Sequence, residues 1–214
     1  MKNKNIAIIL SATIGCLAAL LWPSSYCYGQ TATIRLDNAS YSIEYDNVNH
    51  VPIKAVWVLR KTDFSTPRKR VAKYFKADSR LPKPRIKDAD YKLSGYMRGH
   101  MCPAADRTQT KAMMKETFLM SNVAPQTTAL NCSVWSELEA KSRRMAIAFD
   151  SVRVVVCALF LEPDTLYIAG GRIRVPSHFS REVRVARTDS LLFSFLVDQN
   201  GHSIPLAMVP RLFP

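Results

Sequence analysis

The stretch that decides the fold is SGYMRGHMCPAADR, residues 94–107, in which Arg98 and His100 flank a single glycine. Imidazole has an ordinary pKa near neutrality, so His100 could take a proton from an attacking water. The guanidinium of Arg98 could hold a phosphate through two parallel hydrogen bonds, and Gly99 would let backbone and substrate approach closely. A His beside an Arg is also a common structural pair, so this tripeptide needs a second element before it indicates hydrolysis.

That second element is a predicted helix over residues 131–148, a stretch without Gly or Pro whose apolar residues recur at helical spacing. Asn131, Trp135, Leu138 and Glu139 stand at i, i+4, i+7 and i+8 and therefore share one face. Trp135 and Leu138 are expected to be core anchors. Asn131 and Glu139 are either a helix cap and a solvated surface residue, or oxygen donors for a hard cation such as Mg²⁺.

Four motifs in this order resemble one enzyme family: RGHMCPA at residues 98–104, SNVAPQ at 121–126, NCSVWSELE at 131–139 and VPSHF at 175–179. The combination is similar to the DNA/RNA non-specific endonucleases, ββα-metal enzymes that include bacterial secreted nucleases and mitochondrial endonuclease G. The resemblance runs from about residue 57 to about residue 198. It implies an α+β, ββα-metal nuclease fold with a central, mostly antiparallel sheet flanked by helices.

The resemblance also implies a set of roles for matching residues. His100 would be the general base and Arg98 the phosphate holder, while Asn131 would bind Mg²⁺ directly and Glu139 would hold the waters of the metal. Mn²⁺ is the expected substitute, and no small-molecule cofactor is implied. The expected substrates are DNA and RNA, cleaved without sequence preference to products with 5′-phosphate ends.

Two further residues receive expected roles from their motifs. Asn122 would orient the segment around His100 by hydrogen bonding, unless it is a turn residue before Pro125. Arg143 stands where relatives have a basic residue that contacts the scissile region, unless it is a plain surface charge.

The chain also departs from the family pattern. Met97 occupies the position of an Asp that would help to organise the water shell of the metal, a change that could weaken metal affinity about 10- to 100-fold. The upstream phosphate-binding residue of the family matches either Arg70 or Lys73, and the sequence does not choose between them. Relatives continue beyond the end of this chain with a closing strand and helix, so the domain is expected to be short at its C-terminus.

The N-terminus has the features of a secretory signal peptide over residues 1–29, which leaves a nuclease domain over residues 30–214. Lys2 and Lys4 precede an apolar run from residue 6 to residue 22. The predicted location is therefore secreted or periplasmic. Two alternatives remain: the run could be retained as a membrane anchor, or Cys16 could carry a lipid.

Three cysteines remain after residue 29, an odd number for an oxidising compartment. Cys102 and Cys132 lie in the two motif segments and could be bridged if those segments pack together. Cys157 lies in an apolar run and is expected to be a small core residue of a strand.

Charge favours a polyanionic partner. Loss of Lys2 and Lys4 with the leader would lower the net charge from +13 to +11, and Lys and Arg contacts to phosphates do not depend on base sequence. The basic residues collect in three runs: Arg68, Lys69, Arg70 and Lys73; Lys83, Arg85 and Lys87; and Arg172, Arg174, Arg181, Arg184 and Arg187. Two other functions remain open, a nucleic-acid-binding protein of this fold with weakened catalysis, or a basic envelope protein that binds anionic lipid or another protein.

The expected organisation is a single α+β domain. Strands are predicted at residues 41–46, 55–60, 117–123, 153–161, 174–185 and 191–197. Residues 106–115 are expected to be partly helical, and residues 76–91 to form a surface loop that leads into the strand of the active site.

Overall fold

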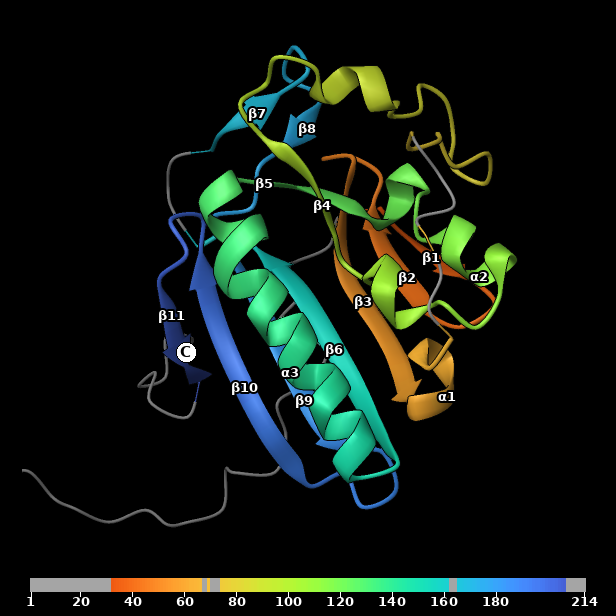
Figure 1. Ribbon diagram of the computed structural model, residues 1–214. Helices are drawn as coiled ribbons and strands as arrows, with labels where there is room; N and C mark the ends of the chain where they lie inside the picture. The colour runs from red at the N-terminus through yellow and green to blue at the C-terminus, as the bar shows by residue number, and fades with distance from the viewer. Residues whose placement is uncertain (1–31, 67–68, 70–73, 162–164, 207–214) are drawn as a thin grey trace, which may run out of the picture.

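The computed structural model describes residues 32–66, 69, 74–161 and 165–206. Its centre is a seven-stranded sheet in the order β1-β2-β3-β6-β9-β10-β11, in which all pairs are antiparallel (Figure 1). The strands are β1 (Thr33–Asp37), β2 (Ser42–Asp46), β3 (Val51–Arg60), β6 (Ser151–Leu159), β9 (His178–Val185), β10 (Leu191–Asp198) and β11 (Ser203–Pro205). This arrangement confirms the predicted α+β fold with a mostly antiparallel central sheet.

The long helix α3 (Trp135–Ala148) crosses one face of this sheet and packs against β3 and β6. A π-helical turn, η5 (Leu130–Val134), precedes it, so helical backbone begins where the sequence predicted. Trp135 and Leu138 are buried in the main core, and the rings of Trp135 and Phe179 lie 5.6 Å apart. The amphipathic spacing therefore identified the core anchors correctly.

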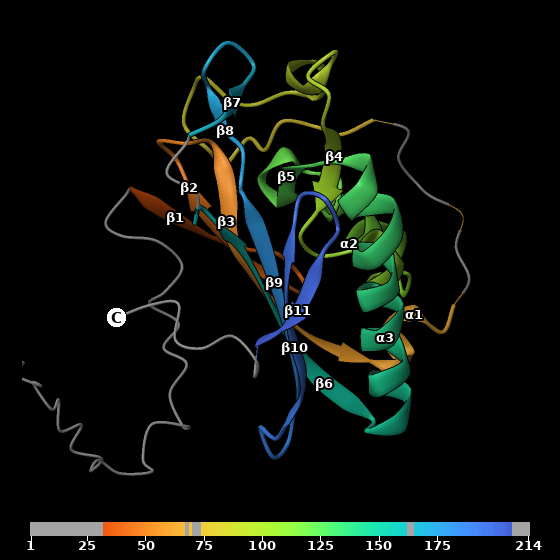
Figure 2. The same cartoon turned by 90° about the vertical axis from the view of Figure 1, so that its left-hand side faces the viewer.

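A smaller layer lies on the same side of the sheet as α3 (Figure 2). It contains the antiparallel pair of strands β4 (Met97–His100) and β5 (Val123–Gln126), together with α1 (Lys61–Phe64) and α2 (Lys111–Glu116). Short 3-10 turns connect these elements: η2 (Asp88–Tyr91), η3 (Ala104–Asp106) and η4 (Met120–Asn122). The hairpin of β7 (Tyr167–Ile168) and β8 (Ile173–Arg174) closes a second hydrophobic cluster that includes Phe75, Tyr91 and Phe118.

Two predicted strands differ from the structure. Residues 117–123 form a turn and η4, and extended backbone begins only at Val123, because the Asn122 side chain donates to the carbonyl oxygen of Thr117 and bends the segment back. The predicted strand at residues 174–185 is two strands, separated around Pro176, which cannot donate to a sheet ladder. Strands β1, β7 and β11 and helix α1 were not predicted from the sequence.

The cysteine prediction was half right. Cys157 is buried in β6, as expected. Cys102 and Cys132 are unbridged thiols: Cys102 is buried, whereas Cys132 is exposed on η5.

Several predictions fall outside the described residues, namely the signal peptide, Cys16, Arg70 and Lys73. Within the described part of the chain, no helix is both long enough and apolar enough to cross a membrane.

Candidate active site

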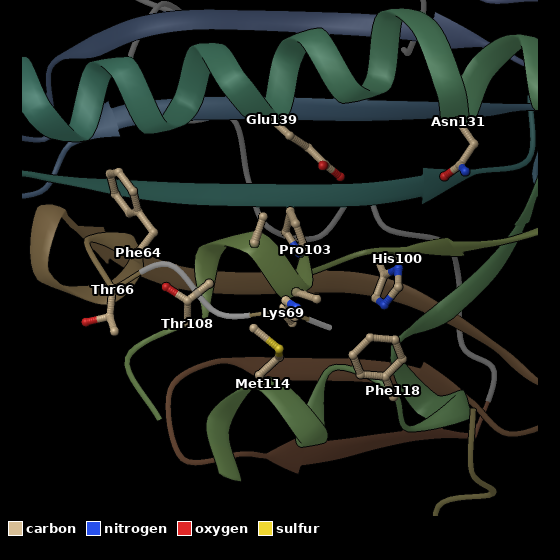
Figure 3. Close-up of a pocket in the computed structure, with 12 residues that line it drawn as sticks. Phe64, Thr66, Lys69, His100, Pro103, Thr108, Met114, Phe118, Asn131 and Glu139 are labelled. Carbon is tan, nitrogen blue, oxygen red and sulfur yellow. The ribbon is translucent and has the colours of Figure 1, made fainter. Parts of the chain in front are cut away.

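A cavity of about 820 Å³ lies between α3, the end of β4 and the turn that follows it, and His100, Asn131 and Glu139 all line it (Figure 3). His100 ends β4, Asn131 lies on η5 and Glu139 lies on α3. His100 is therefore brought to the same cavity as two residues of a helical segment that is distant from it in sequence. The wall opposite α3 includes Thr108, Met114 and Phe118.

Aromatic contacts fix the ring of His100. Its centroid lies 5.0 Å from the Phe75 ring and 5.2 Å from the Phe118 ring, the latter in an edge-to-face arrangement. Such contacts hold the plane of the imidazole while one edge remains at the cavity. Neither phenylalanine was predicted to belong to the site, although Phe118 immediately precedes the SNVAPQ segment.

Gly99 has a different role from the one its position suggested. A Cβ atom at residue 99 would lie 2.2 Å from Oε1 of Gln126, so the glycine makes room for a buried side chain of β5 rather than for a substrate. The close packing of β4 on β5 depends on this missing side chain.

Asn122 holds the chain immediately after His100. Its Oδ1 accepts a hydrogen bond from the backbone N–H of Cys102 at 2.9 Å, and its Nδ2 donates to the carbonyl oxygen of Cys102 at 2.9 Å. The backbone N–H of Met101 donates to the carbonyl oxygen of Asn122 at 3.0 Å. All of these groups are buried, so the contacts have the form expected of a residue that orients the His100 segment.

Asn131 contacts the residue that departs from the family pattern. Its Nδ2 lies 3.5 Å from Sδ of Met97, and Sγ of Cys132 lies 3.6 Å from the same sulfur. Figure 3 shows the amide oxygen of Asn131 on the side of Glu139. The oxygen, which is the atom able to bind a hard cation, is thus available to the cavity.

Glu139 is held in an environment that disfavours its charge. Its side chain is 18% exposed, and burial raises its pKa to about 7, an effect that Arg181 opposes. Nη2 of Arg181 lies 3.8 Å from Oε1 of Glu139. Arg181 supplies one nearby positive charge, and a bound cation such as Mg²⁺ would supply a second.

Arg181 itself was assigned wrongly to the basic surface. It is fully buried, with its guanidinium carbon 4.7 Å from the Trp135 ring centroid and 5.6 Å from that of Trp57. The alternation of Phe179, Arg181 and Val183 along β9 could have placed it on the inner face, because all three are buried there. Arg181 is therefore the buried cationic partner of Glu139.

The structure does not bring the other two predicted arginines to this cavity. Nε of Arg98 lies 2.6 Å from Oδ1 of Asp88, and Nη1 of Arg143 lies 2.8 Å from Oδ1 of Asp106. Asp106 is buried and also accepts a hydrogen bond from Nε1 of Trp57 at 3.2 Å. Among the described residues, Lys69 is the lysine that lines the cavity, and it was predicted only as part of a basic run.

The donor set fits a hard cation held by few protein ligands. Asn131 and Glu139 offer an amide oxygen and a carboxylate, the donor types that Mg²⁺ prefers. Across the residues that the structure describes, no three His, Cys, Asp or Glu side chains gather closely enough to form a metal site. An ion here would therefore keep most of its waters.

The order of elements around the cavity, two antiparallel strands followed by a helix, defines the ββα-metal class of nuclease folds. The fold is similar to that of the crystal structure of the EndoG/EndoGI complex, with a TM-score of 0.68 and 26% identity over 87% of this chain and 78% of that one. Residues 25–204 match the family model described as DNA/RNA non-specific endonuclease. The chain belongs to this family.

Curated relatives agree with the family assignment. The chain is 31% identical to the mitochondrial nuclease EXOG of Xenopus laevis over 88% of its own length and 52% of that protein. It is 32% identical to nuclease C1 of Cunninghamella echinulata var. echinulata over 76% of its own length and 70% of that protein. It is also 32% identical to mitochondrial endonuclease G of Bos taurus, over 71% and 54%. The chain thus spans about half the length of the EXOG and endonuclease G relatives.

Proposed function

We propose that this protein is an exported, metal-dependent endonuclease that hydrolyses DNA and RNA without sequence preference and leaves 5′-phosphate ends. The observation that supports this function best is the convergence of His100, Asn131 and Glu139 on one cavity. The names of the relatives, which are nucleases, support the same reaction class. Export is inferred from the apolar leader over residues 1–29.

In this proposal His100 is the general base. Phe75 and Phe118 hold its ring, and Asn122 fixes the backbone that follows it. The imidazole would take a proton from the attacking water, which is efficient because its ordinary pKa is near neutrality. Fixed orientation is part of the rate enhancement, since a positioned base avoids the entropic cost of finding its water.

Asn131 and Glu139 would hold the metal, Mg²⁺ or Mn²⁺ in its place. Asn131 would be the direct ligand through its amide oxygen, and Glu139 would accept hydrogen bonds from the waters of the ion. When bound, the ion would supply stabilisation of the negative charge on the phosphorane and on the leaving 3′ oxygen. Burial of Glu139 next to Arg181 keeps the carboxylate directed at this position.

Arg98 and Arg143 are assigned to the substrate. Each pairs with a carboxylate and remains partly exposed, 27% for Arg98 and 24% for Arg143. Arg98 would exchange Asp88 for the phosphate, and Arg143 would contact the nucleic acid near the scissile bond. Bidentate pairing to a phosphate suits a guanidinium.

One specific observation favours a second candidate, a nucleic-acid-binding member of the fold with weakened catalysis. The thioether of Met97 lies against Asn131 where a carboxylate would organise the waters of the metal. The loss of such a group lowers metal affinity or activity about 10- to 100-fold in other metal sites.

A single assay separates the two candidates. The full chain is incubated with plasmid DNA and with RNA, in Mg²⁺ or in EDTA, next to His100→Ala. His202→Ala is the matched control because His202 is exposed and pairs with Asp198 away from the cavity. Metal-dependent degradation that is lost in His100→Ala and kept in His202→Ala supports the endonuclease. Bound but intact nucleic acid supports the second candidate.

A further inference from the structure

A second cavity, of about 630 Å³, lies where the segment of residues 77–90 meets the β7–β8 hairpin. We name it the basic cavity, and its lining residues are Ala77, Lys83, Pro84, Arg85, Lys87, Asp90 and Arg172. Four cationic side chains and one carboxylate therefore face it. Such an excess of positive charge around a concave surface attracts anions.

Backbone carbonyl groups hold the two arginines of the basic cavity in place but do not neutralise their charge. Nε of Arg85 donates to the carbonyl oxygen of Leu81 at 2.6 Å, and its Nη2 donates to that of Ser79 at 2.9 Å. Nε of Arg172 donates to the carbonyl oxygen of Ala169 at 3.2 Å. A backbone carbonyl orients a guanidinium but carries no net charge.

Among the described residues that line the cavity, Asp90 is the one carboxylate, and it pairs with Arg172. Lys83 and Lys87 are exposed, and in the described part of the chain neither forms an ion pair. Their ammonium groups are strongly hydrated point charges that bind phosphate without demanding a fixed geometry. The cavity is thus lined by two arginines, which backbone carbonyl groups hold in place, and by two lysines, whose ammonium groups can bind a phosphate in several geometries.

Strand β4 lies between the basic cavity and the cavity lined by His100, Asn131 and Glu139, which we name the catalytic cavity. Arg98 at the start of β4 pairs with Asp88 of η2, and Arg172 pairs with Asp90 of the same turn. Both views place η2 and the β7–β8 hairpin beyond the N-terminal end of β4, whereas His100 is at its C-terminal end (Figures 1 and 2). The four residues of β4 alone span roughly 10 Å, so the two cavities are separated by at least about three nucleotides along one strand of a duplex.

We propose that the basic cavity binds a backbone phosphate of the same nucleic acid strand, a few nucleotides away from the bond that is cleaved. This inference rests on the proposed function. Lys83 and Lys87 supply the charge, and Arg85 and Arg172 shape the wall. The contact would be independent of base sequence, and only a strand long enough to leave the catalytic cavity would reach it.

The test measures binding in EDTA with a His100→Ala background, so that the substrate stays intact. Lys83→Ser/Lys87→Ser is compared with Arg144→Ser/Arg187→Ser, which removes two exposed charges elsewhere on the surface. Fluorescence anisotropy follows a duplex of about 20 base pairs at salt concentrations from about 50 to about 200 mM. Losing two phosphate contacts should make the slope of log K against log [salt] shallower by about 1.8. Between about 50 and about 200 mM salt, the affinity of the lysine variant should therefore fall by a factor about 12 times smaller than that of the parent.

The control pair should keep the slope of the parent. An oligonucleotide of about two nucleotides is too short to span β4, so it should bind the lysine variant as well as it binds the parent. An unchanged slope for the lysine variant, or an equal loss with the short oligonucleotide, would overturn the basic cavity as a separate phosphate site while leaving the proposed function intact. A parent that binds no duplex even at low salt would overturn the proposed function, and the basic cavity with it.

Discussion

Replacing Arg181 by Met tests the view that this arginine is the buried support of Glu139. The thioether keeps an unbranched stem between the two tryptophan rings but removes the charge 3.8 Å from the carboxylate. Glu139 would then be left in a buried site without its nearest cation. We expect the variant to fold with a large loss of stability.

The size of the loss follows from the contacts. Removing one partner of a buried ion pair costs about 3–5 kcal/mol, and the loss of cation–π attraction to the two rings adds about 1 kcal/mol, partly recovered by packing of the thioether. A total of about 4 kcal/mol should lower Tm by about 8–16 °C for a chain of this size. The loss should be greater at pH 8 than at pH 5, because protonation relieves the unpaired Glu139 at lower pH.

The assay is urea denaturation, followed by tryptophan fluorescence, of the parent, Arg181→Met, Glu139→Gln and the double variant at both pH values. The double variant should be more stable at pH 8 than Arg181→Met alone, since it has no unpaired charge to bury. A loss below about 1 kcal/mol in Arg181→Met would refute the reasoning. So would a double variant that is no more stable than this single variant.

Three further predictions concern the same cavity. Met97→Asp should raise Mg²⁺ affinity about 10- to 100-fold by calorimetry, with Met97→Leu unchanged, because a carboxylate beside Asn131 could accept from the waters of the ion. In EDTA, the free energy of unfolding of the parent, relative to that of Glu139→Gln, should fall by about 3 kcal/mol as pH rises from about 4.5 through 7. The reason is that the raised pKa of Glu139 in the folded state stabilises the protein only at pH values below that pKa. A difference in denaturation midpoints that does not change with pH would contradict this. Asn122→Ala should cost about 3 kcal/mol in denaturation, because it leaves the buried backbone groups of Cys102 unpaired; a loss within experimental error would mean that water replaces the amide.

The parts of the site that could be predicted were those with a local pattern. Spacing along one helix put Trp135 and Leu138 in the core, and it put Asn131 and Glu139 on a common face, because a helix fixes which side chains can meet. Asn122 was also found from its motif, and its hydrogen bonds to the backbone of Cys102 agree with the expected orientation of the segment that follows His100.

What could not be predicted depends on contacts between distant segments. The partner of Arg98 is Asp88 on a separate turn, and nothing in the strand that contains Arg98 indicates it. Phe75 reaches the ring of His100 only through tertiary packing. The prediction for Arg181 was wrong because a charged side chain is usually exposed, whereas here its neighbours two residues away are apolar and buried on the same face of β9.

The close packing of Gly99 against Gln126 limits the substitutions that the paired strands β4 and β5 can accept. Any side chain at residue 99 would collide with Gln126 as it stands, whereas a smaller residue at 126 would open the space first. The order of substitution therefore matters: a change at 126 can be tolerated before a change at 99, but the reverse order produces a clash beside His100. A library that varies residues 99 and 126 together should therefore recover pairs of substitutions that single-site scans reject.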